Sequence, residues 1–200
     1  MSPSRSTSDS PQLDLLGGSQ AMPAEIHRLF FALVPDLSVR KRIAGTAKGL
    51  PQRATTGAQW RDPSLYHGTL HFLGDHPMLR QDLVSAAIAA ADKVAISPFE
   101  WVLDQVVGFR GRQPPCVLCG RVIPEPMQRL WQDLRHALIL AGLGRHLEKN
   151  FTPHVTLAYI HGEVREPMAI EPVVWPIAGF ELIHSVTGRG RYETLAAWHG

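Results

Sequence analysis

The pattern His-x-Thr-Leu occurs twice in this 200-residue chain, beginning at His67 and at His154. A chain of this composition rarely contains even one copy by chance, so two copies indicate a shared role. In a β-strand, residues two positions apart lie on the same face. We therefore expect His67 beside Thr69 and His154 beside Thr156, so that each copy presents one imidazole and one hydroxyl.

Two imidazoles and two hydroxyls, with no nearby cluster of carboxylates, favour phosphoryl transfer that needs no metal and no other cofactor. The reference pKa of imidazole is about 6.5, so one histidine can accept a proton from an attacking hydroxyl or water while another protonates the departing oxygen. Threonine hydroxyls can bind the non-bridging phosphate oxygens as negative charge grows on them. Thr69 and Thr156 are therefore predicted phosphate-binding residues.

Two stretches of the chain repeat the order strand, helix, strand, and each ends in the His-x-Thr-Leu pattern. The first stretch runs from about residue 28 to 73, and the second from about 116 to 158. The proline that closes the first strand of each stretch precedes the motif histidine by 32 residues for Pro35 and by 30 residues for Pro124. These matching lengths indicate an internal duplication.

The predicted fold class is α+β, with two similar lobes that face each other across a central cleft. Each lobe is expected to be a mainly antiparallel sheet with helices on its outer face. Residues 99–107, 173–186 and 191–198 have the composition of further strands, and residues 79–94 have the apolar spacing of a helix.

The chain divides into a tail and one domain. Residues 1–24 are rich in Ser, Pro and Gly and lack apolar periodicity, so we expect a disordered tail, followed by a single bilobal domain at 25–200. Within the tail, Gln12–Leu16 resembles the short peptide by which bacterial proteins dock on the replication sliding clamp. There is no secretory signal and no long apolar run, so we expect a cytoplasmic protein without a membrane partner, and we expect a monomer.

Longer stretches around the two motifs resemble a known family. They read RLFFALVP at 28–35, WRDPSLYHGTLHFLG at 60–74, FTPHVTLAY at 151–159 and RYETLAAW at 191–198. They are similar to the bacterial RNA 2′,3′-cyclic phosphodiesterases, also called 2′-5′ RNA ligases, of the two-histidine phosphoesterase superfamily. The resemblance implies hydrolysis of a ribose 2′,3′-cyclic phosphate to a 2′-phosphate and, in some members, reversible 2′-5′ joining of RNA ends, without ATP or metal. The implied partners are RNA ends or small nucleotides that carry a cyclic phosphate.

The resemblance also implies different roles for the two motif histidines: His67 donates a proton to the leaving 3′ oxygen, and His154 is the proton acceptor. Two positions depart from the family pattern. The family often has a substrate-contacting arginine where this chain has Tyr159, so another arginine would have to supply that contact. Gly68 replaces a bulky apolar residue, which predicts looser packing beside the first motif.

Strict alternation along the motif strands suggests further assignments. His71 lies four positions after His67, so we expect it on the catalytic face as a candidate substrate contact. Tyr159 is a second candidate contact, because an aromatic ring can stack on any nucleobase. The same alternation turns Phe72 away from the catalytic face and into the core.

Two other functions stay open at this point. The first is a nucleotide- or RNA-binding module that keeps the cleft without turnover, which the tyrosine at position 159 favours. The second is metal binding, which is disfavoured because the remaining histidines show no ligand spacing. Cys116 and Cys119 form a single C-x-x-C within a strand, where they would face opposite sides, so we interpret them as core residues.

Overall fold

The computed structural model of the chain describes residues 25–51, 57–109, 114–160 and 166–200. The tail at 1–24, with the clamp-like segment Gln12–Leu16, lies outside these residues. No helix in the described part of the chain is long and apolar enough to cross a membrane.

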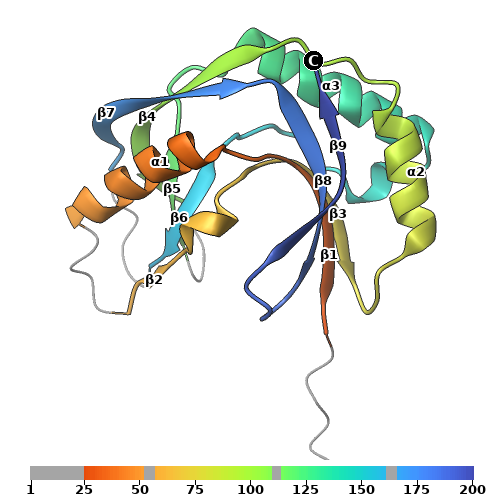
Figure 1. The fold of residues 1–200 in the computed structure, drawn as a ribbon, viewed down its shortest axis with the longest axis horizontal. Helices are drawn as coiled ribbons and strands as arrows, with labels where there is room; N and C mark the ends of the chain where they lie inside the picture. Colours follow the sequence, from red (N-terminus) through yellow and green to blue (C-terminus); the bar gives the residue numbers. More distant parts are fainter. Residues whose placement is uncertain (1–24, 52–56, 110–113, 161–165) are drawn as a thin grey trace, which may run out of the picture.

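Nine strands, three α-helices and short 3-10 turns make up the described residues (Figure 1). The strands are β1 (His27–Leu33), β2 (Gln59–Trp60), β3 (Gly68–His76), β4 (Phe99–Gly108), β5 (Pro115–Cys119), β6 (Val155–Tyr159), β7 (Met168–Ile177), β8 (Gly179–Val186) and β9 (Tyr192–His199). The helices are α1 (Leu37–Gly49), α2 (Gln81–Ala91) and α3 (Glu125–Leu140), and the 3-10 turns are η2 (Pro63–Leu65) and η3 (Gly144–His146).

The strands form one antiparallel sheet in the order β7-β4-β5-β6-β3-β1-β8-β9, with β2 paired to β6. The sheet divides into a first lobe, β3-β1-β8-β9, and a second lobe, β7-β4-β5-β6 with β2. The two motif strands join the lobes, because β3 pairs with β6 at Gly68 and Val155. The predicted α+β class, with two mainly antiparallel lobes, is confirmed.

Helices α1 and α3 pack across the lobes. Helix α1 follows β1 of the first lobe and leads to β2 of the second, and it packs against β7 of the second lobe. Helix α3 connects β5 and β6 of the second lobe but packs against β3 of the first. Helix α2 packs on α3, so both lie on the same side of the molecule in Figure 1, opposite α1. Asp36 begins α1 by accepting a hydrogen bond from the Val39 amide at 2.7 Å. Each connecting helix thus ties its own lobe to the other.

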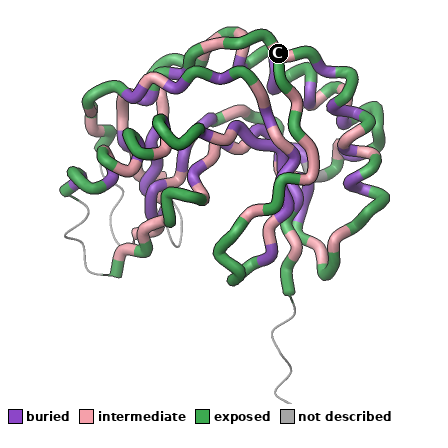
Figure 2. Tube along the Cα trace, viewed as in Figure 1, coloured by how far each residue is buried: buried purple, intermediate pink, exposed green. Residues whose placement is uncertain are grey.

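The core follows the strands and the inner faces of the helices, as the buried trace in Figure 2 shows. Its largest buried side chains include Trp101 and Trp175, whose rings stack with centroids 5.4 Å apart. A smaller apolar cluster of Phe30, Ala32 and Ile183 lies on the opposite face of the first lobe. Phe30 of this cluster, and Phe72 and Tyr192 packed against it, also line the cleft described below.

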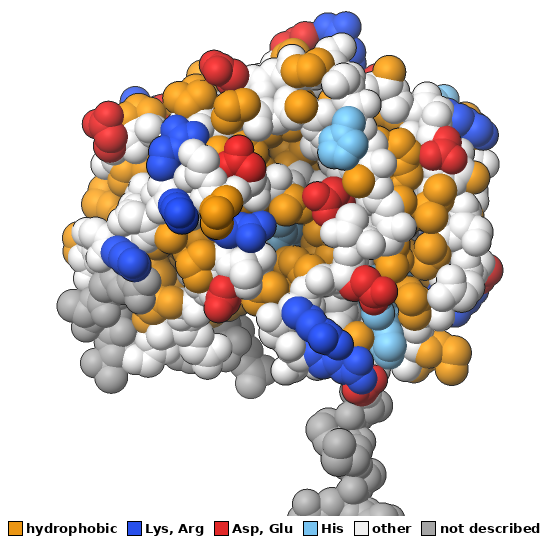
Figure 3. Space-filling model, viewed as in Figure 1, with side chains coloured by type: hydrophobic (Ala, Val, Ile, Leu, Met, Phe, Trp, Pro, Cys, Tyr) orange, Lys and Arg blue, Asp and Glu red, His pale blue; other side chains and the backbone are white. Residues whose placement is uncertain are grey.

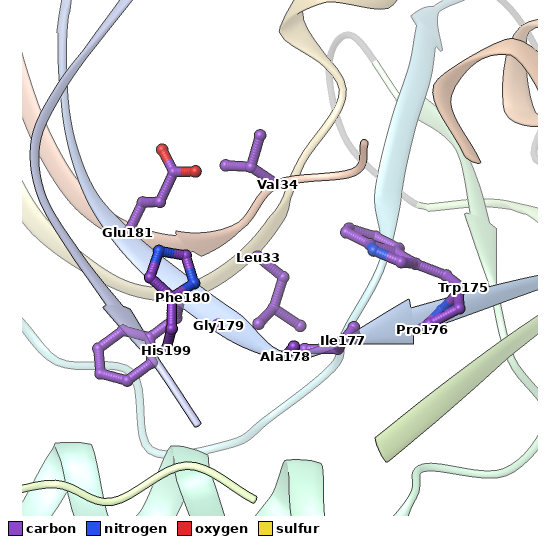
Figure 4. A pocket seen from close by; sticks show the side chains of 10 residues that line it. All are labelled: Leu33, Val34, Trp175, Pro176, Ile177, Ala178, Gly179, Phe180, Glu181 and His199. Carbon is purple, nitrogen blue, oxygen red and sulfur yellow. The ribbon is translucent and has the colours of Figure 1, made fainter. Parts of the chain in front are cut away.

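The segment 173–186, predicted as one strand, is two strands in different lobes. Strand β7 ends at Ile177 and β8 begins at Gly179, so the chain crosses at Ala178 from β7, at one edge of the sheet, to β8, which lies next to the other edge strand (Figure 4). A Cβ at Gly179 would lie 2.6 Å from both the His199 Nδ1 atom and the Trp198 carbonyl oxygen, so only glycine fits this close approach. Apolar periodicity alone did not indicate the crossing because both strands are largely apolar.

Packing beside Gly68 is tight, which corrects the prediction of a loosened site. A Cβ at position 68 would lie 3.0 Å from Cζ3 of Trp101, and that indole is fully buried and stacked on Trp175. The tryptophan ring therefore occupies the space that a larger residue at 68 would need.

Replacing Gly68 with valine should lower the free energy of unfolding by about 1–3 kcal/mol, because the added methyl groups meet a ring with no room to move. Urea unfolding of both proteins measures the difference. Gly45→Ala is the matched control: a Cβ there meets nothing within 4 Å, so the helix should keep or gain stability, by up to about 1 kcal/mol. Equal stability of Gly68→Val and the wild type would contradict this account.

Candidate active site

Both motif strands carry an irregularity at the same place, directly after the motif threonine. On β3, the partners of Phe31 and Ala32 are His71 and Thr69, so Leu70 is an extra residue. On β6, the partners of Cys116 and Val117 are Ala158 and Thr156, so Leu157 is the equivalent extra residue. A bulge of this kind reverses which later side chains face each side of the sheet. The burial pattern from 68 to 72 is the same as that from 155 to 159.

Each bulged leucine carbonyl has a donor from outside its own strand. The Trp131 indole N–H donates to the Leu70 carbonyl at 3.0 Å, and the Arg61 backbone N–H donates to the Leu157 carbonyl at 2.8 Å. A buried carbonyl that lacks a strand partner is costly, so these two bonds stabilise the bulges.

The bulge in β3 makes two expectations from strict alternation wrong. Phe72, predicted in the core, lines the cleft with Thr69, and His71, predicted on the catalytic face, points away from the cleft. The His71 ring stacks on Trp131 with centroids 5.1 Å apart, and its Nε2–H donates to the Trp131 carbonyl at 2.9 Å. Burial lowers the pKa of His71 to about 4, so it is a neutral core residue of the α3 interface.

A cleft of about 420 Å³ collects residues from both lobes. Figure 3 shows the surface hollowed here, with basic, acidic and histidine side chains at the hollow. All four predicted catalytic and phosphate-binding residues line it, together with the candidate contact Tyr159. These residues are His67, Thr69, His154, Thr156 and Tyr159.

A second pocket, of about 170 Å³, lies at the crossing from β7 to β8 (Figure 4). Its walls are mainly apolar, with Glu181 and His199 as its ionisable groups. No motif residue lines it, so the cleft between the lobes is the candidate active site.

The two motif histidines are held in the same way. The Nδ1–H of His67 donates to the Leu65 carbonyl at 2.9 Å, and the Nδ1–H of His154 donates to the Thr152 carbonyl at 2.7 Å. In both cases the acceptor lies two residues before the histidine. A carbonyl only accepts, so Nδ1 carries the proton of the neutral ring and Nε2 is free for chemistry.

Aromatic rings enclose both imidazoles. His67 packs against Phe30 and Tyr192, with centroid separations of 5.1 and 5.3 Å, and the edge of His154 meets Phe109 at 4.9 Å. These ring contacts cover part of the surface of each imidazole. Both histidines are thereby held with restricted rotation in the cleft.

Burial lowers the pKa of His67 to about 4, and the positive charges of Arg61 and His154 add to that shift. Burial also lowers the pKa of His154. The hydrogen bonds to the carbonyls of Leu65 and Thr152 oppose both shifts. Both imidazoles line the same cleft, and the charge of His154 contributes to the lowered pKa of His67.

Arg61 is a cleft residue that sequence reasoning missed. Its Nη2 donates to the Tyr192 hydroxyl at 2.5 Å, and its Nε is buried without a hydrogen-bond partner. Arg28 also lines the cleft, but it forms an ion pair with Asp75 at 3.0 Å. The signal for Arg61 was its place directly after a short strand and six residues before the motif histidine.

Within the described residues, no three His, Cys, Asp or Glu side chains converge in a way that could hold a metal ion. Cys116 is buried and Cys119 is partly buried. Two imidazoles, two hydroxyls and a guanidinium are therefore among the groups that line the cleft. Such a set is suited to acid/base chemistry on an anion such as a phosphate ester.

Comparison with known proteins agrees with this class of site. A family model described as LigT like Phosphoesterase matches residues 34–119, which include the first motif. E. coli LigT in apo form is 27% identical in sequence and superposes with a TM-score of 0.68, covering 88% of this chain and 98% of that one. The protein TT0787 of Thermus thermophilus shares the fold, with 24% identity, a TM-score of 0.69 and coverage of 86% and 97%. No curated protein sequence matches the chain.

These findings confirm the resemblance that the motifs indicated. The chain is similar to the LigT-like phosphoesterases in sequence over residues 34–119, and it is similar to E. coli LigT in fold over most of its length. E. coli LigT has also been crystallised with 3′-AMP, ATP, NADP+ and phosphate.

Replacing His71 with leucine should change the pH dependence of stability and leave the chemistry of the cleft intact. The folded-state pKa of His71, about 4, lies below its ordinary value of 6.5, so the unfolded chain binds the extra proton between these pH values. Wild-type stability therefore falls as pH falls through this window. The variant should lose up to about 1.4 kcal/mol of this dependence per pH unit.

Denaturant unfolding from pH 7 to pH 4, with His136→Leu on the exposed face of α3 as the control, measures the difference. An unchanged slope, or loss of phosphoesterase activity in a His71→Leu protein of wild-type stability, would contradict the assignment of His71 to the core.

Proposed function

We propose that this protein hydrolyses RNA or nucleoside 2′,3′-cyclic phosphates to 2′-phosphates, using His67 and His154 as acid and base. The observation that supports this most directly is the matched pair of imidazoles, each held through Nδ1 and each beside a motif threonine in one cleft. A cleft of about 420 Å³ has the size expected for a small-molecule site, as a nucleotide-sized ligand requires. The crystal structures of E. coli LigT with nucleotides support the same ligand class.

In the proposed reaction, Nε2 of His154 accepts a proton from a water molecule as its oxygen attacks phosphorus. The bond between phosphorus and the ribose 3′ oxygen breaks, and Nε2–H of His67 protonates that oxygen. The products are a 2′-phosphate and a free 3′-hydroxyl. His67 therefore has to be protonated, and His154 neutral, when the substrate is bound.

The threonines and the imidazole positions account for the rest of the catalysis. The hydroxyls of Thr69 and Thr156 donate hydrogen bonds to the non-bridging oxygens as their charge increases. The two imidazoles come from opposite lobes, which suits an in-line displacement in which base and acid act on opposite sides of phosphorus. A ribose 5′-hydroxyl in place of water would join two RNA ends through a 2′-5′ linkage by the same proton transfers.

Replacing either motif histidine with alanine should lower kcat for a nucleoside 2′,3′-cyclic phosphate by roughly 10²- to 10⁴-fold, because a general acid or base contributes about that much. The assay contains EDTA, and the wild-type rate should be the same with and without it. His136→Ala, on the exposed face of α3, removes a histidine far from the chemistry and should keep the wild-type rate.

Two outcomes would contradict the mechanism. Activity that disappears with the chelator would exclude the metal-independent form, and activity that survives the double replacement of His67 and His154 would exclude the two-histidine form. Tight nucleotide binding without product over hours would instead support a binding module.

The pH dependence of kcat/KM should be bell-shaped, with its alkaline limb at an apparent pKa below 6.5. The reason is that the acid must be protonated in the free enzyme, and the pKa values of both His67 and His154 are lowered there. An anionic substrate favours the imidazolium form, so the alkaline limb of kcat should lie at higher pH than that of kcat/KM. Initial rates from pH 4 to 9 test both limbs. A kcat/KM that rises steadily from pH 6.5 to pH 8 would be inconsistent with this environment.

A further inference from the structure

At position 159 the cleft has a tyrosine, where the family that the chain resembles often has an arginine. The cleft nevertheless contains the guanidinium of Arg61. Arg61 follows β2, which pairs with β6 so that Gln59 lies opposite Tyr159. The Arg61 amide is fixed to the Leu157 carbonyl, within the second motif strand, and its side chain lines the cleft with both motif histidines. The guanidinium thus reaches the site from the strand next to the one that carries position 159.

We propose that Arg61 binds the phosphate group of the substrate and supplies the contact that Tyr159 cannot make. The inference rests on the proposed function for the identity of the substrate. The inference adds a specific anion-binding residue to that function. Arg61 is bonded to the second motif strand at Leu157, whereas position 159 is the end of that strand.

The hydrogen bonding of Arg61 leaves capacity for an anion. One Nη2 bond goes to the neutral Tyr192 hydroxyl, and the buried Nε has no partner. No carboxylate forms an ion pair with Arg61 among the described residues, whereas Arg28 on the same cleft is paired with Asp75. A buried N–H without an acceptor is costly, and a phosphate oxygen can satisfy it with a charge-assisted bond.

Tyr192 connects the guanidinium to the first catalytic histidine. Its hydroxyl accepts the bond from Arg61, while its ring meets His67 edge to face with an interplanar angle of 84° and a centroid separation of 5.3 Å. Burial raises the pKa of Tyr192 and the charge of Arg61 opposes that shift, whereas for His67 burial lowers the pKa and the charge of Arg61 adds to the shift. Arg61 therefore acts electrostatically on both groups. A phosphate that contacts Arg61 therefore lies close enough to influence His67.

A bound phosphate reverses the effect that Arg61 has on His67. In the free cleft, the guanidinium disfavours a second positive charge on the imidazole. An anion between the two groups neutralises the guanidinium and favours the imidazolium. Arg61 would therefore select for an anionic ligand and also allow His67 to gain its proton when that ligand is present.

Three variants test the inference: Arg61→Ala, Arg61→Lys and the double variant Arg61→Ala with Tyr159→Arg. Calorimetric titration with inorganic phosphate and with 3′-AMP should give a Kd for Arg61→Ala that is roughly 10- to 100-fold weaker than wild type, the loss expected for a charge-assisted bond. Arg61→Lys keeps the charge without the planar fork, so it should lie between the two. Tyr159→Arg in the Arg61→Ala background should recover a substantial part of the binding.

Arg129→Ala is the matched control, because it removes one arginine from an exposed ion pair with Glu125 on α3. Its Kd for 3′-AMP should stay within about twofold of the wild-type value, as expected for an exposed pair. Circular dichroism and Tm establish that each variant is folded, and Arg61→Gln replaces Arg61→Ala if the latter unfolds, because its amide can still donate to Tyr192.

A Kd for Arg61→Ala or Arg61→Gln within about twofold of wild type, in a folded protein, would overturn the inference. Failure of Tyr159→Arg to recover any binding would overturn the claim that Arg61 replaces the contact at position 159. The binding assay needs no turnover, so it separates this inference from the proposed function. Wild-type protein that binds 3′-AMP through Arg61 but hydrolyses no cyclic phosphate would contradict only the latter.

Discussion

The hydrogen bond from the Trp131 indole to the Leu70 carbonyl determines which side chains the first lobe presents to the cleft. It stabilises a bulge that turns Phe72 towards the cleft and His71 towards α3. Without the bulge, strict alternation would place the His71 imidazole in the cleft and the Phe72 ring in the core. The bond also joins α3, which belongs to the second lobe in sequence, to the motif strand of the first. The same interaction therefore sets the chemistry of the cleft wall and the packing of the lobes.

The second lobe reaches the same arrangement by a different bond. Its bulged carbonyl, at Leu157, accepts from the backbone N–H of Arg61 rather than from a side chain. As a result, the residue that stabilises the second bulge also places a guanidinium in the cleft. The duplicated motifs are therefore equivalent in their histidines and threonines, which all line the cleft, and different in the groups that stabilise their bulges.

Features that repeat along the chain could be predicted from the sequence, whereas features that depend on contacts between distant parts could not. The two His-x-Thr-Leu motifs identified four residues that line one cleft, and the repeated strand-helix-strand order indicated the bilobal α+β fold. The bulges were missed because they depend on pairing with a neighbouring strand, although one clue was an aromatic residue three positions after each motif threonine, at Phe72 and Tyr159. Arg61 precedes the first motif in sequence, but its amide bonds to the second motif strand, as does β2 just before it, so its place in the sequence did not indicate this contact. Gly68 indicated a missing side chain, but only the fold shows that Trp101 fills the space.

The electrostatics of the cleft link ligand binding to proton position. The free site contains two imidazoles whose pKa values are lowered and one guanidinium that lacks a carboxylate partner among the described residues. In that state the imidazoles stay mostly neutral near pH 7, which suits the proposed base but leaves the proposed acid without its proton. A phosphate anion adds the negative charge that the site lacks, and it stabilises an imidazolium beside the guanidinium. The negative charge of the substrate would thus balance the positive charges of the site. The proposed acid, His67, would gain the proton for the leaving oxygen when the substrate is bound.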